Sequence, residues 1–365
     1  MVAKSPAFPS GKAAIFSKPG TSFEIVCREL PPIKSGEILV KTEFTTICGS
    51  DVHTFSGRRI EPSRVVLGHE IVGNIIWIDS EHPGVDLRGE PISIGDRITW
   101  SIFAVPTGSK SPRKDLPQKS APLFKYGHAL AEGDDVFNGG LAEYCILRKN
   151  TALIKLSGEI PAGTAATINC AHSTVAGALR VAGEISGKNV LVFGAGLLGL
   201  SCVAMCKEAG AEMVSITDYD EDRLRWGKPF GANQTFTYPG NNQANNLPWS
   251  KMDLVFDMTG SPDAMKSGIA SLAIGGVAVW VGAVYPEKPV EVDAQVIVRN
   301  MLQIRGLYNY NYEDFLNATT FIEKNWQKYP FEGLVEREFT LDEVDDAFAF
   351  AAKNKPVRAG VRLNH

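Results

Sequence analysis

Cysteine, histidine and carboxylate side chains gather in three stretches of the chain. The first begins at Cys48 (CGSDVH), the second contains His69 (GHE), and the third contains Cys170 (INCAH). Zinc prefers thiolate and imidazole ligands in a tetrahedron, and a catalytic ion keeps one position open. Cys48, His69 and Cys170 would supply two sulfurs and one nitrogen. The spacing alone does not select these three, because distant ligands have no local pattern and a single cysteine is more often a buried apolar residue.

A glycine-rich turn follows the apolar stretch NVLVF (189–193) and opens a helical pattern. In this context G-x-G-x-x-G predicts a dinucleotide site, where glycines permit a tight turn, backbone approach to the pyrophosphate and close helix–strand packing. The N-terminus of the helix favours the phosphates. The turn residues expected at the cofactor are Gly194, Gly196, Leu197, Leu198 and Gly199.

Asp218 ends the next strand, 19 residues after Gly199. A carboxylate there accepts from a ribose 2′-OH and repels a 2′-phosphate, so NAD(H) is favoured over NADP(H). Further cofactor contacts are expected from Arg223, Thr259 and Gly282. Cys202 and Cys206, on the helix after the turn, have the spacing of a metal pair, but their apolar face predicts core residues.

Composition excludes several classes of protein. The 365 residues carry a net charge of −4, which gives no electrostatic footprint for nucleic acid. No apolar run is long enough for a membrane helix, and the N-terminus lacks the apolar run of a signal peptide. Six scattered cysteines are too few for a disulfide scaffold and predict a reducing, cytoplasmic setting. Neither a nucleic-acid nor a membrane partner is expected.

The elements that must position these residues change in type near residue 165. Earlier, short β-type runs broken by Gly and Pro predict antiparallel sheets, at 12–16, 23–27, 37–44 and 70–78. Later, apolar strands alternate with helices and predict a parallel sheet. Its strands are expected at 189–193, 213–217, 253–259 and 277–282, and its helices at 200–211, 220–232 and 262–272. Helices at 312–327 and 341–353 precede a last strand at 358–363.

These motifs resemble the zinc-dependent medium-chain dehydrogenase/reductase family, to which alcohol, sorbitol and threonine dehydrogenases belong. The resemblance runs nearly end to end, through CGSDVH, LGHEIVG, GDRI, GGLAEY, INCAHSTV and VFGAGLLGL. It implies an α/β Rossmann domain with a parallel sheet and a β-rich, GroES-like catalytic domain. The implied ranges are 1–171 for the first part of the catalytic domain, 172–308 for the NAD-binding domain, and 309–365 for the part that completes the catalytic domain.

The resemblance also implies roles for the site residues. Cys48, His69 and Cys170 are similar to the catalytic zinc ligands, and Asp51 is similar to the carboxylate that orients the ligating histidine.

Glu70 resembles a carboxylate that approaches zinc during ligand exchange; the alternative is a buried ion-pair partner. Ser50 and His53 match a relay that takes the alcohol proton to solvent. Arg358 resembles an arginine near the cofactor phosphate and Asp51.

The implied reaction moves a hydride between a hydroxyl-bearing substrate and NAD, with one zinc ion acting as Lewis acid. The expected protein is therefore an NAD-dependent, zinc-containing alcohol dehydrogenase, as a homodimer or homotetramer. Three alternatives stay open: a sorbitol- or threonine-type dehydrogenase, a zinc-free quinone reductase, and a nucleotide-binding protein without catalysis. The three zinc-type ligands argue against the second, and the pair Ser50 and His53 argues against the third.

Two features depart from the family. Many relatives hold a structural zinc with four cysteines, whereas 107–121 contains none and has Thr107, Lys110 and Arg113 near the first three ligand positions. We therefore expect no structural zinc. Residues 103–140 are expected to form a surface lobe that ordinary packing holds together. Glycines in or beside the lobe are expected to make loops; they include Gly127, Gly139 and Gly140.

The second departure is a pair of arginines, Arg58 and Arg59, shortly after His53. Arginine matches carboxylate or phosphate oxygens, so the pair suggests an anionic substrate group; the alternative is a solvated charged loop. The stretches HTFSGRRIEPSRVVLGHE and INCAHSTVAGALRVAG also resemble a subgroup associated with phosphonate catabolism. A hydroxyalkyl phosphonate or similar anionic alcohol is the expected substrate.

Overall fold

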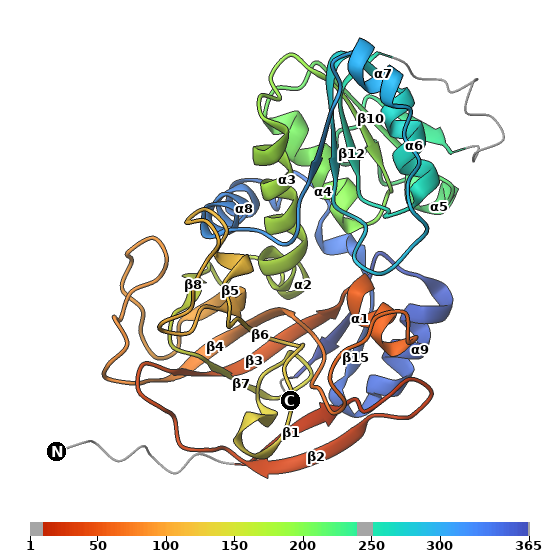
Figure 1. The fold of residues 1–365 in the computed structure, drawn as a ribbon. Helices are drawn as coiled ribbons and strands as arrows, with labels where there is room; N and C mark the ends of the chain where they lie inside the picture. The colour runs from red at the N-terminus through yellow and green to blue at the C-terminus, as the bar shows by residue number, and fades with distance from the viewer. Residues whose placement is uncertain (1–9, 239–250, 364–365) are drawn as a thin grey trace. The chain divides into compact units, whose positions relative to one another are not determined.

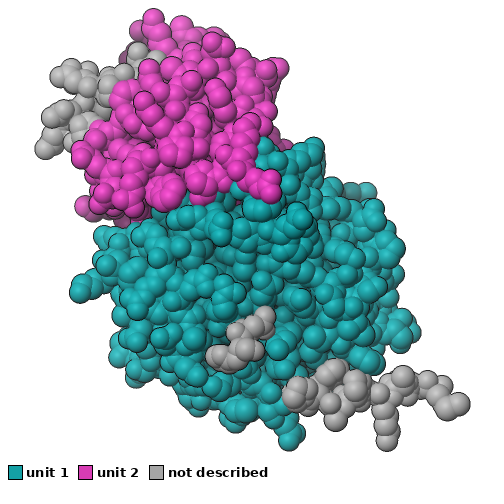
Figure 2. All heavy atoms as spheres, turned by 180° about the vertical axis from the view of Figure 1, so that it is seen from behind, with its two compact units in different colours: residues 1–170, 311–326, 331–365 teal, residues 171–310, 327–330 magenta. Residues whose placement is uncertain are grey.

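The computed structural model describes residues 10–238 and 251–363. Its contacts divide the chain into two compact units, which Figure 2 colours separately. Unit 1 comprises Met1–Cys170, Asn311–Trp326 and Phe331–His365, and unit 2 comprises Ala171–Tyr310 and Gln327–Pro330. Unit 1 is therefore assembled from three separate segments of the chain.

Unit 1 is built on two sheets (Figure 1). Its strands are β1 (Ser10–Ile15), β2 (Glu24–Glu29), β3 (Ile38–Ile47), β4 (Glu70–Ile78), β5 (Arg97–Ala104), β6 (Phe124–Lys125), β7 (Tyr144–Leu147), β8 (Thr151–Lys155), β15 (Val335–Thr340) and β16 (Arg358–Arg362). β1 pairs with β2, and the larger sheet has the order β15-β16-β3-β4-β5-β6, with β7 on β3 and β8 on β5. Every pair except β15–β16 is antiparallel, as expected for this region.

The last strand of the chain lies beside the strand that leads into the first candidate ligand. β16 pairs with β3, with Ala359 opposite Ile47, and β3 ends one residue before Cys48. Arg358, at the start of β16, is thereby brought to the same end of the sheet.

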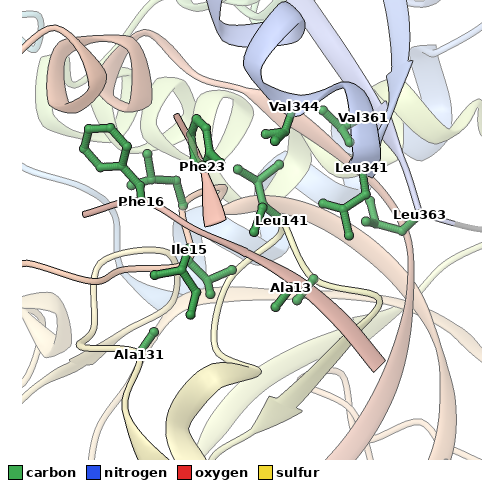
Figure 3. Packing of buried hydrophobic residues seen from close by; sticks show 14 of the residues in the cluster. Ala13, Ile15, Phe16, Phe23, Ala131, Leu141, Leu341, Val344, Val361 and Leu363 are labelled. Carbon is green, nitrogen blue, oxygen red and sulfur yellow. The ribbon is translucent and has the colours of Figure 1, made fainter. Parts of the chain in front are cut away.

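The α-helices in the described residues of unit 1 are α1 (Gly49–Phe55), α2 (Ala162–Ala166), α8 (Tyr312–Asn325) and α9 (Val344–Asn354). An aromatic cluster anchors α1, because the ring of Phe55 lies 5.9 Å from Phe16, 6.2 Å from Phe23 and 5.2 Å from Phe348. The neighbouring core draws on β1, α9 and β16. Figure 3 shows its members Ala13, Ile15, Phe16, Phe23, Ala131, Leu141, Leu341, Val344, Val361 and Leu363.

Unit 2 holds a six-stranded sheet in the order β11-β10-β9-β12-β13-β14, and all of its pairs are parallel. Its strands are β9 (Asn189–Phe193), β10 (Met213–Asp218), β11 (Gln234–Thr237), β12 (Met252–Asp257), β13 (Leu272–Trp280) and β14 (Gln303–Gly306). Its helices are α3 (Ser173–Ala182), α4 (Leu197–Glu208), α5 (Glu221–Leu224), α6 (Pro262–Ala270) and α7 (Ala294–Arg299). The predicted parallel sheet is confirmed.

One predicted helix is much shorter than expected. The charged stretch 220–232 forms a helix only over Glu221–Leu224 and continues as turns. Gly227 and Pro229 explain the early end, because glycine is flexible and proline lacks the N–H and clashes with the preceding turn.

The polar stretch 103–140 is a surface lobe only in part. Within 107–121 only Gln118 and Ser120 are buried, and hydrogen bonds hold the chain: Ser111 Oγ donates to the carbonyl oxygens of Arg113 and Leu116, at 2.5 and 2.9 Å. The lobe is held by local hydrogen bonds over 107–121 and elsewhere by packing, since the side chains of Phe103, Tyr126 and Phe137 are buried. No helix in the described part of the chain has the length and apolar character needed to cross a membrane.

Candidate metal and dinucleotide sites

The three residues expected to bind zinc meet in unit 1. Cys48 immediately precedes α1, His69 immediately precedes β4, and Cys170 lies in a π-helical turn, Ile168–His172. One ligand atom of each lies within 4.8 Å of the others, with Cys48 and His69 buried and Cys170 half-buried. Two sulfurs and one imidazole nitrogen this close, away from bulk solvent, match the donor set of a zinc site with an open position.

The Asp51 carboxylate contacts both His69 and the backbone of Cys48. Its Oδ1 lies 3.3 Å from His69 Nδ1 and also accepts from the backbone N–H of Gly68 at 3.3 Å. Its Oδ2 accepts from the backbone N–H of Cys48 at 2.9 Å. A carboxylate behind Nδ1 leaves the imidazole Nε2 for a metal, which is how ligating histidines are commonly oriented. Ser50 Oγ lies 3.3 Å from that Nε2.

Glu70 is held in a buried ion pair. Arg358 binds it with Nε and Nη2, at 2.8 and 2.9 Å, and the Thr46 hydroxyl donates to its Oε2 at 2.5 Å. The Arg358 guanidinium faces Glu70, with Nη2 3.8 Å from Cys48 Sγ, and its expected place near Asp51 and a cofactor phosphate stays a prediction. The antiparallel pairing of β16 with β3 causes this placement.

The Cys48 thiol is poised to ionise. A hydrogen bond from the Cys170 thiol lowers its pKa well below the ordinary value, against the opposing effect of burial, and the nearby charge of Arg358 lowers it further. Thiolate is the form that binds metal.

Ser50 and His53 both lie on α1, three residues apart and hence on one face of the helix. Both are half-buried. The two arginines that follow are placed differently from each other. Arg58 is exposed, whereas Arg59 Nε forms an ion pair with Glu61 Oε1 at 2.8 Å.

Two residues beside the metal cluster were missed from the sequence. His128 Nδ1 lies 3.0 Å from Glu61 Oε1, and its ring centroid is 5.0 Å from that of His69. Burial lowers the pKa of His128 to about 4, so the ring is neutral at pH 7. No local pattern could have revealed this pair, since 67 residues separate its members.

The glycines expected to make loops lie in turns and bends, and they also allow close packing against the chain that leads to His69. A Cβ on Gly127 would lie 2.5 Å from the carbonyl oxygen of Gly68 and 3.1 Å from His69 Cβ. A Cβ on Gly139 would overlap the Val66 carbonyl, and one on Gly140 would overlap the Thr45 hydroxyl.

The glycine turn in unit 2 has the geometry that a dinucleotide requires. Gly194 has φ +100°, a conformation that side chains disfavour, and a Cβ on Gly199 would overlap the Gly194 carbonyl. Gly196 caps α4, whose first residues are Leu197 (buried) and Leu198 (half-buried). The backbone N–H groups in the first turn of this twelve-residue helix are suited to bind phosphate.

The remaining predicted cofactor residues surround this turn. Asp218 ends β10, and its Oδ2 accepts from the N–H of Ala195 at 2.6 Å. Arg223 Nη1 would lie 3.9 Å from a Cβ on Gly196, and Thr259 Cγ2 would lie 2.9 Å from one on Gly194.

Gly282 approaches the Gly260 backbone so closely that a Cβ on it would overlap the Gly260 N–H. Cys202 and Cys206 are fully buried on α4, with sulfurs 4.0 Å apart, which confirms them as core residues.

Two family models match the chain. The alcohol dehydrogenase GroES-like domain matches residues 34–158, and the zinc-binding dehydrogenase model matches residues 198–324. The L-threonine 3-dehydrogenase of Shewanella frigidimarina is 26% identical over 346 residues, which cover 92% of this chain and 95% of that protein.

Two solved structures share the fold. An alcohol dehydrogenase from Thermotoga maritima superposes with a TM-score of 0.89 at 22% identity, over 97% of this chain and 100% of the other. A putative zinc-binding dehydrogenase from Sinorhizobium meliloti 1021, bound to NADP, gives a TM-score of 0.83 at 20% identity, with coverage of 97% and 100%.

Proposed function

The chain belongs to the zinc-dependent medium-chain dehydrogenases, oxidoreductases that act on CH–OH groups, and we propose that it interconverts an alcohol and its carbonyl compound with NAD(H) as cofactor. The observation that carries the proposal is the convergence of Cys48, His69 and Cys170 within 4.8 Å. Zinc held there supplies a Lewis acid toward the alcohol oxygen, and NAD supplies the oxidant.

The chain's own side chains orient the metal ligands and move the proton. Asp51 fixes the orientation of His69, and the buried ion pair of Glu70 keeps Arg358 beside the Cys48 sulfur. Ser50, within reach of the metal cluster, accepts the hydroxyl proton, and His53 on the same helix face passes it to solvent.

The cofactor we propose is NAD(H), with one catalytic zinc and no structural zinc. The Asp218 carboxylate at the end of β10 supports NAD(H), since it would repel a 2′-phosphate. The absence of cysteine from 107–121 supports the single zinc.

We also propose a cytoplasmic homo-oligomer. All six cysteines are free, which suits a reducing compartment. The edge strand β14 and its surroundings expose apolar side chains, a surface typical of association. They are Ile274, Val298, Met301 and Ile304. A mass in solution of two or four times 39.5 kDa, measured by light scattering, would agree, and a monomer would not.

For the substrate we propose an anionic alcohol such as a hydroxyalkyl phosphonate, with Arg58 as its cation. The Arg58 guanidinium has no ion pair or hydrogen bond within residues 10–238 and 251–363, whereas Arg59 is engaged by Glu61. Arg58→Ala should lower kcat/KM for a hydroxyalkyl phosphonate by about tenfold or more and leave a neutral alcohol unchanged, because charge-assisted hydrogen bonds contribute about 1.5–3 kcal/mol.

Lys114→Ala, which removes an exposed cation from the lobe, is the control. NADH absorbance with each substrate reports the rates. Equal rates for Arg58→Ala and wild type on both substrates would reject the anion site.

A polyol or an amino alcohol is the second candidate substrate. Two observations favour it: Glu61 neutralises one of the two expected anion-binding arginines, and the relative that matches over 92% of the chain is a threonine dehydrogenase.

A further inference from the structure

Unit 1 contains a cavity that the proposed mechanism does not use. Its volume is about 490 Å³, within the range of small-molecule binding sites. Every residue that lines it belongs to unit 1: the segment 158–164, which includes the start of α2, lies opposite residues of β3, β5, β15, β16 and the short turn Glu332–Leu334. The three residues of the metal cluster are not part of the lining, so the cavity is a separate site.

One wall of the cavity is held by a largely enclosed arginine. Arg97 binds Glu43 with Nε and Nη2, at 2.7 and 2.9 Å, and its Nη1 donates to the carbonyl oxygen of Ile160 at 2.7 Å. The side chains of Arg97 and Glu43 are 11% and 20% exposed. Gly163 packs on the opposite wall, since a Cβ on it would lie 2.5 Å from Val335 Cγ2. These contacts fix the shape of the cavity.

The charged side chains of the lining carry a net charge of −2, because they are four carboxylates and two guanidinium groups. Both guanidinium groups already have a carboxylate partner. Arg97 is paired as described, and Arg362 binds Glu338 Oε2 with Nε and Nη2, at 3.0 and 2.8 Å. The other two carboxylates, of Glu159 and Glu332, make no hydrogen bond or ion pair within residues 10–238 and 251–363. The cavity therefore favours a cationic ligand.

A buried hydroxyl in the lining also lacks a partner. Thr164 is 2% exposed, and its Oγ1 makes no hydrogen bond with the described part of the chain. Buried polar atoms are normally satisfied by protein, water or ligand, and a hydroxyl oxygen can accept from an N–H group in the cavity. Among the described residues, the one group of side chains that converges as metal ligands do is Cys48, His69 and Cys170. An organic cation therefore fits the lining better than a metal ion.

We propose that this cavity binds an aliphatic diamine. Its two ammonium groups pair with the carboxylates of Glu159 and Glu332, and one of them also donates to Thr164 Oγ1. Pro161 and Val335, both half-buried, supply apolar lining for the methylene groups between the two charges. The diamine is a ligand of unit 1 and not the substrate of the redox reaction.

Calorimetric titration of the zinc-loaded full chain with 1,4-diaminobutane tests the proposal, and n-butylamine is the matched monoamine. The diamine should bind at one site per chain, and butylamine should bind about tenfold more weakly or worse, because it lacks the second cation. This comparison uses wild type alone and does not depend on the folding of a variant.

Variants of the lining test which side chains hold the diamine. The protein with both Glu159→Gln and Glu332→Gln should bind it about tenfold more weakly, because two ion pairs are lost. Thr164→Val keeps the shape of the side chain and should weaken binding about threefold or more, because the hydroxyl acceptor is lost. Glu132→Gln, at an exposed glutamate of unit 1 outside the cavity lining, is the control and should bind as wild type does.

No heat of binding from the diamine with wild type would overturn the proposal, as would equal affinities for the diamine and butylamine. Unchanged diamine affinity after the two glutamate substitutions would also overturn it. A loss as large with Glu132→Gln would show attraction to the acidic surface as a whole and would overturn it too. The titrations contain neither NAD nor an alcohol, so their outcome is independent of the proposed dehydrogenase function.

Discussion

Arg358 and Glu70 illustrate how single residues support the metal cluster. Both side chains are buried, at 8% and 0% exposed, and two hydrogen bonds join them beside the Cys48 sulfur. A buried ion pair adds little to the net stability of the folded protein. Removing one partner is nevertheless costly, because it leaves the other charge buried and unpaired.

Arg358→Gln should therefore destabilise the protein by about 3–5 kcal/mol and lower its melting temperature by roughly 10 °C. Arg362→Gln is the matched control on the same strand, because its ion pair with Glu338 is exposed (44% and 47%) and worth less than about 1 kcal/mol. Calorimetry of the two variants beside wild type checks this. Similar melting temperatures for both variants would show that the Arg358 pair is not a buried support.

Residue types near the metal could be predicted, but not all of their partners. Cys48, His69 and Cys170 became candidates through their chemistry together with the resemblance to a known family, since spacing alone could not select them. The bond between Glu61 and His128 and the pairing of Arg358 with Glu70 join residues 67 and 288 positions apart. The first pair joins two loops and the second depends on strand register, and no local pattern reports either.

At the scale of elements, the segment that carries Gly139 packs directly on the chain leading to His69. A Cβ at this position would overlap the Val66 carbonyl, which is rigid backbone. Gly139→Ala should cost about 1–3 kcal/mol of stability, because the added methyl group overpacks the contact, and it should also reduce zinc content by displacing His69.

Gly158→Ala is the control, because nothing lies within 4 Å of its added Cβ and its φ is ordinary. Urea unfolding and metal analysis measure the two effects. The account is contradicted if Gly139→Ala is as stable and as zinc-rich as Gly158→Ala.

Elements with a strong hydrophobic period were predicted well. β4 occupies the predicted 70–78, β9 occupies 189–193, and α6 lies within 262–272. The stretch 220–232 failed because charge and length suggested a helix, while Gly227 and Pro229 end it early. The glycines at 127, 139 and 140 lie in loops as predicted, but composition does not show which backbone they contact.

For the whole molecule, the change from a β-rich pattern to a βαβ pattern along the chain was enough to predict an antiparallel and a parallel sheet. The resemblance implied that the C-terminal part completes the catalytic domain, but the pairing of residues 359–362 with 44–47 was not predicted. That long-range pairing places Arg358 at the metal cluster and makes unit 1 a product of three chain segments.

The central claim is that Cys48, His69 and Cys170 hold a zinc ion needed for NAD-dependent alcohol oxidation. Metal analysis combined with NADH absorbance on wild type and Cys48→Ser tests it most directly, with Cys27→Ser at an exposed cysteine as control. Wild type and Cys27→Ser should hold one zinc per chain and form NADH with an alcohol, and Cys48→Ser should lose both. A Cys48→Ser protein that keeps its zinc and its activity would contradict the account.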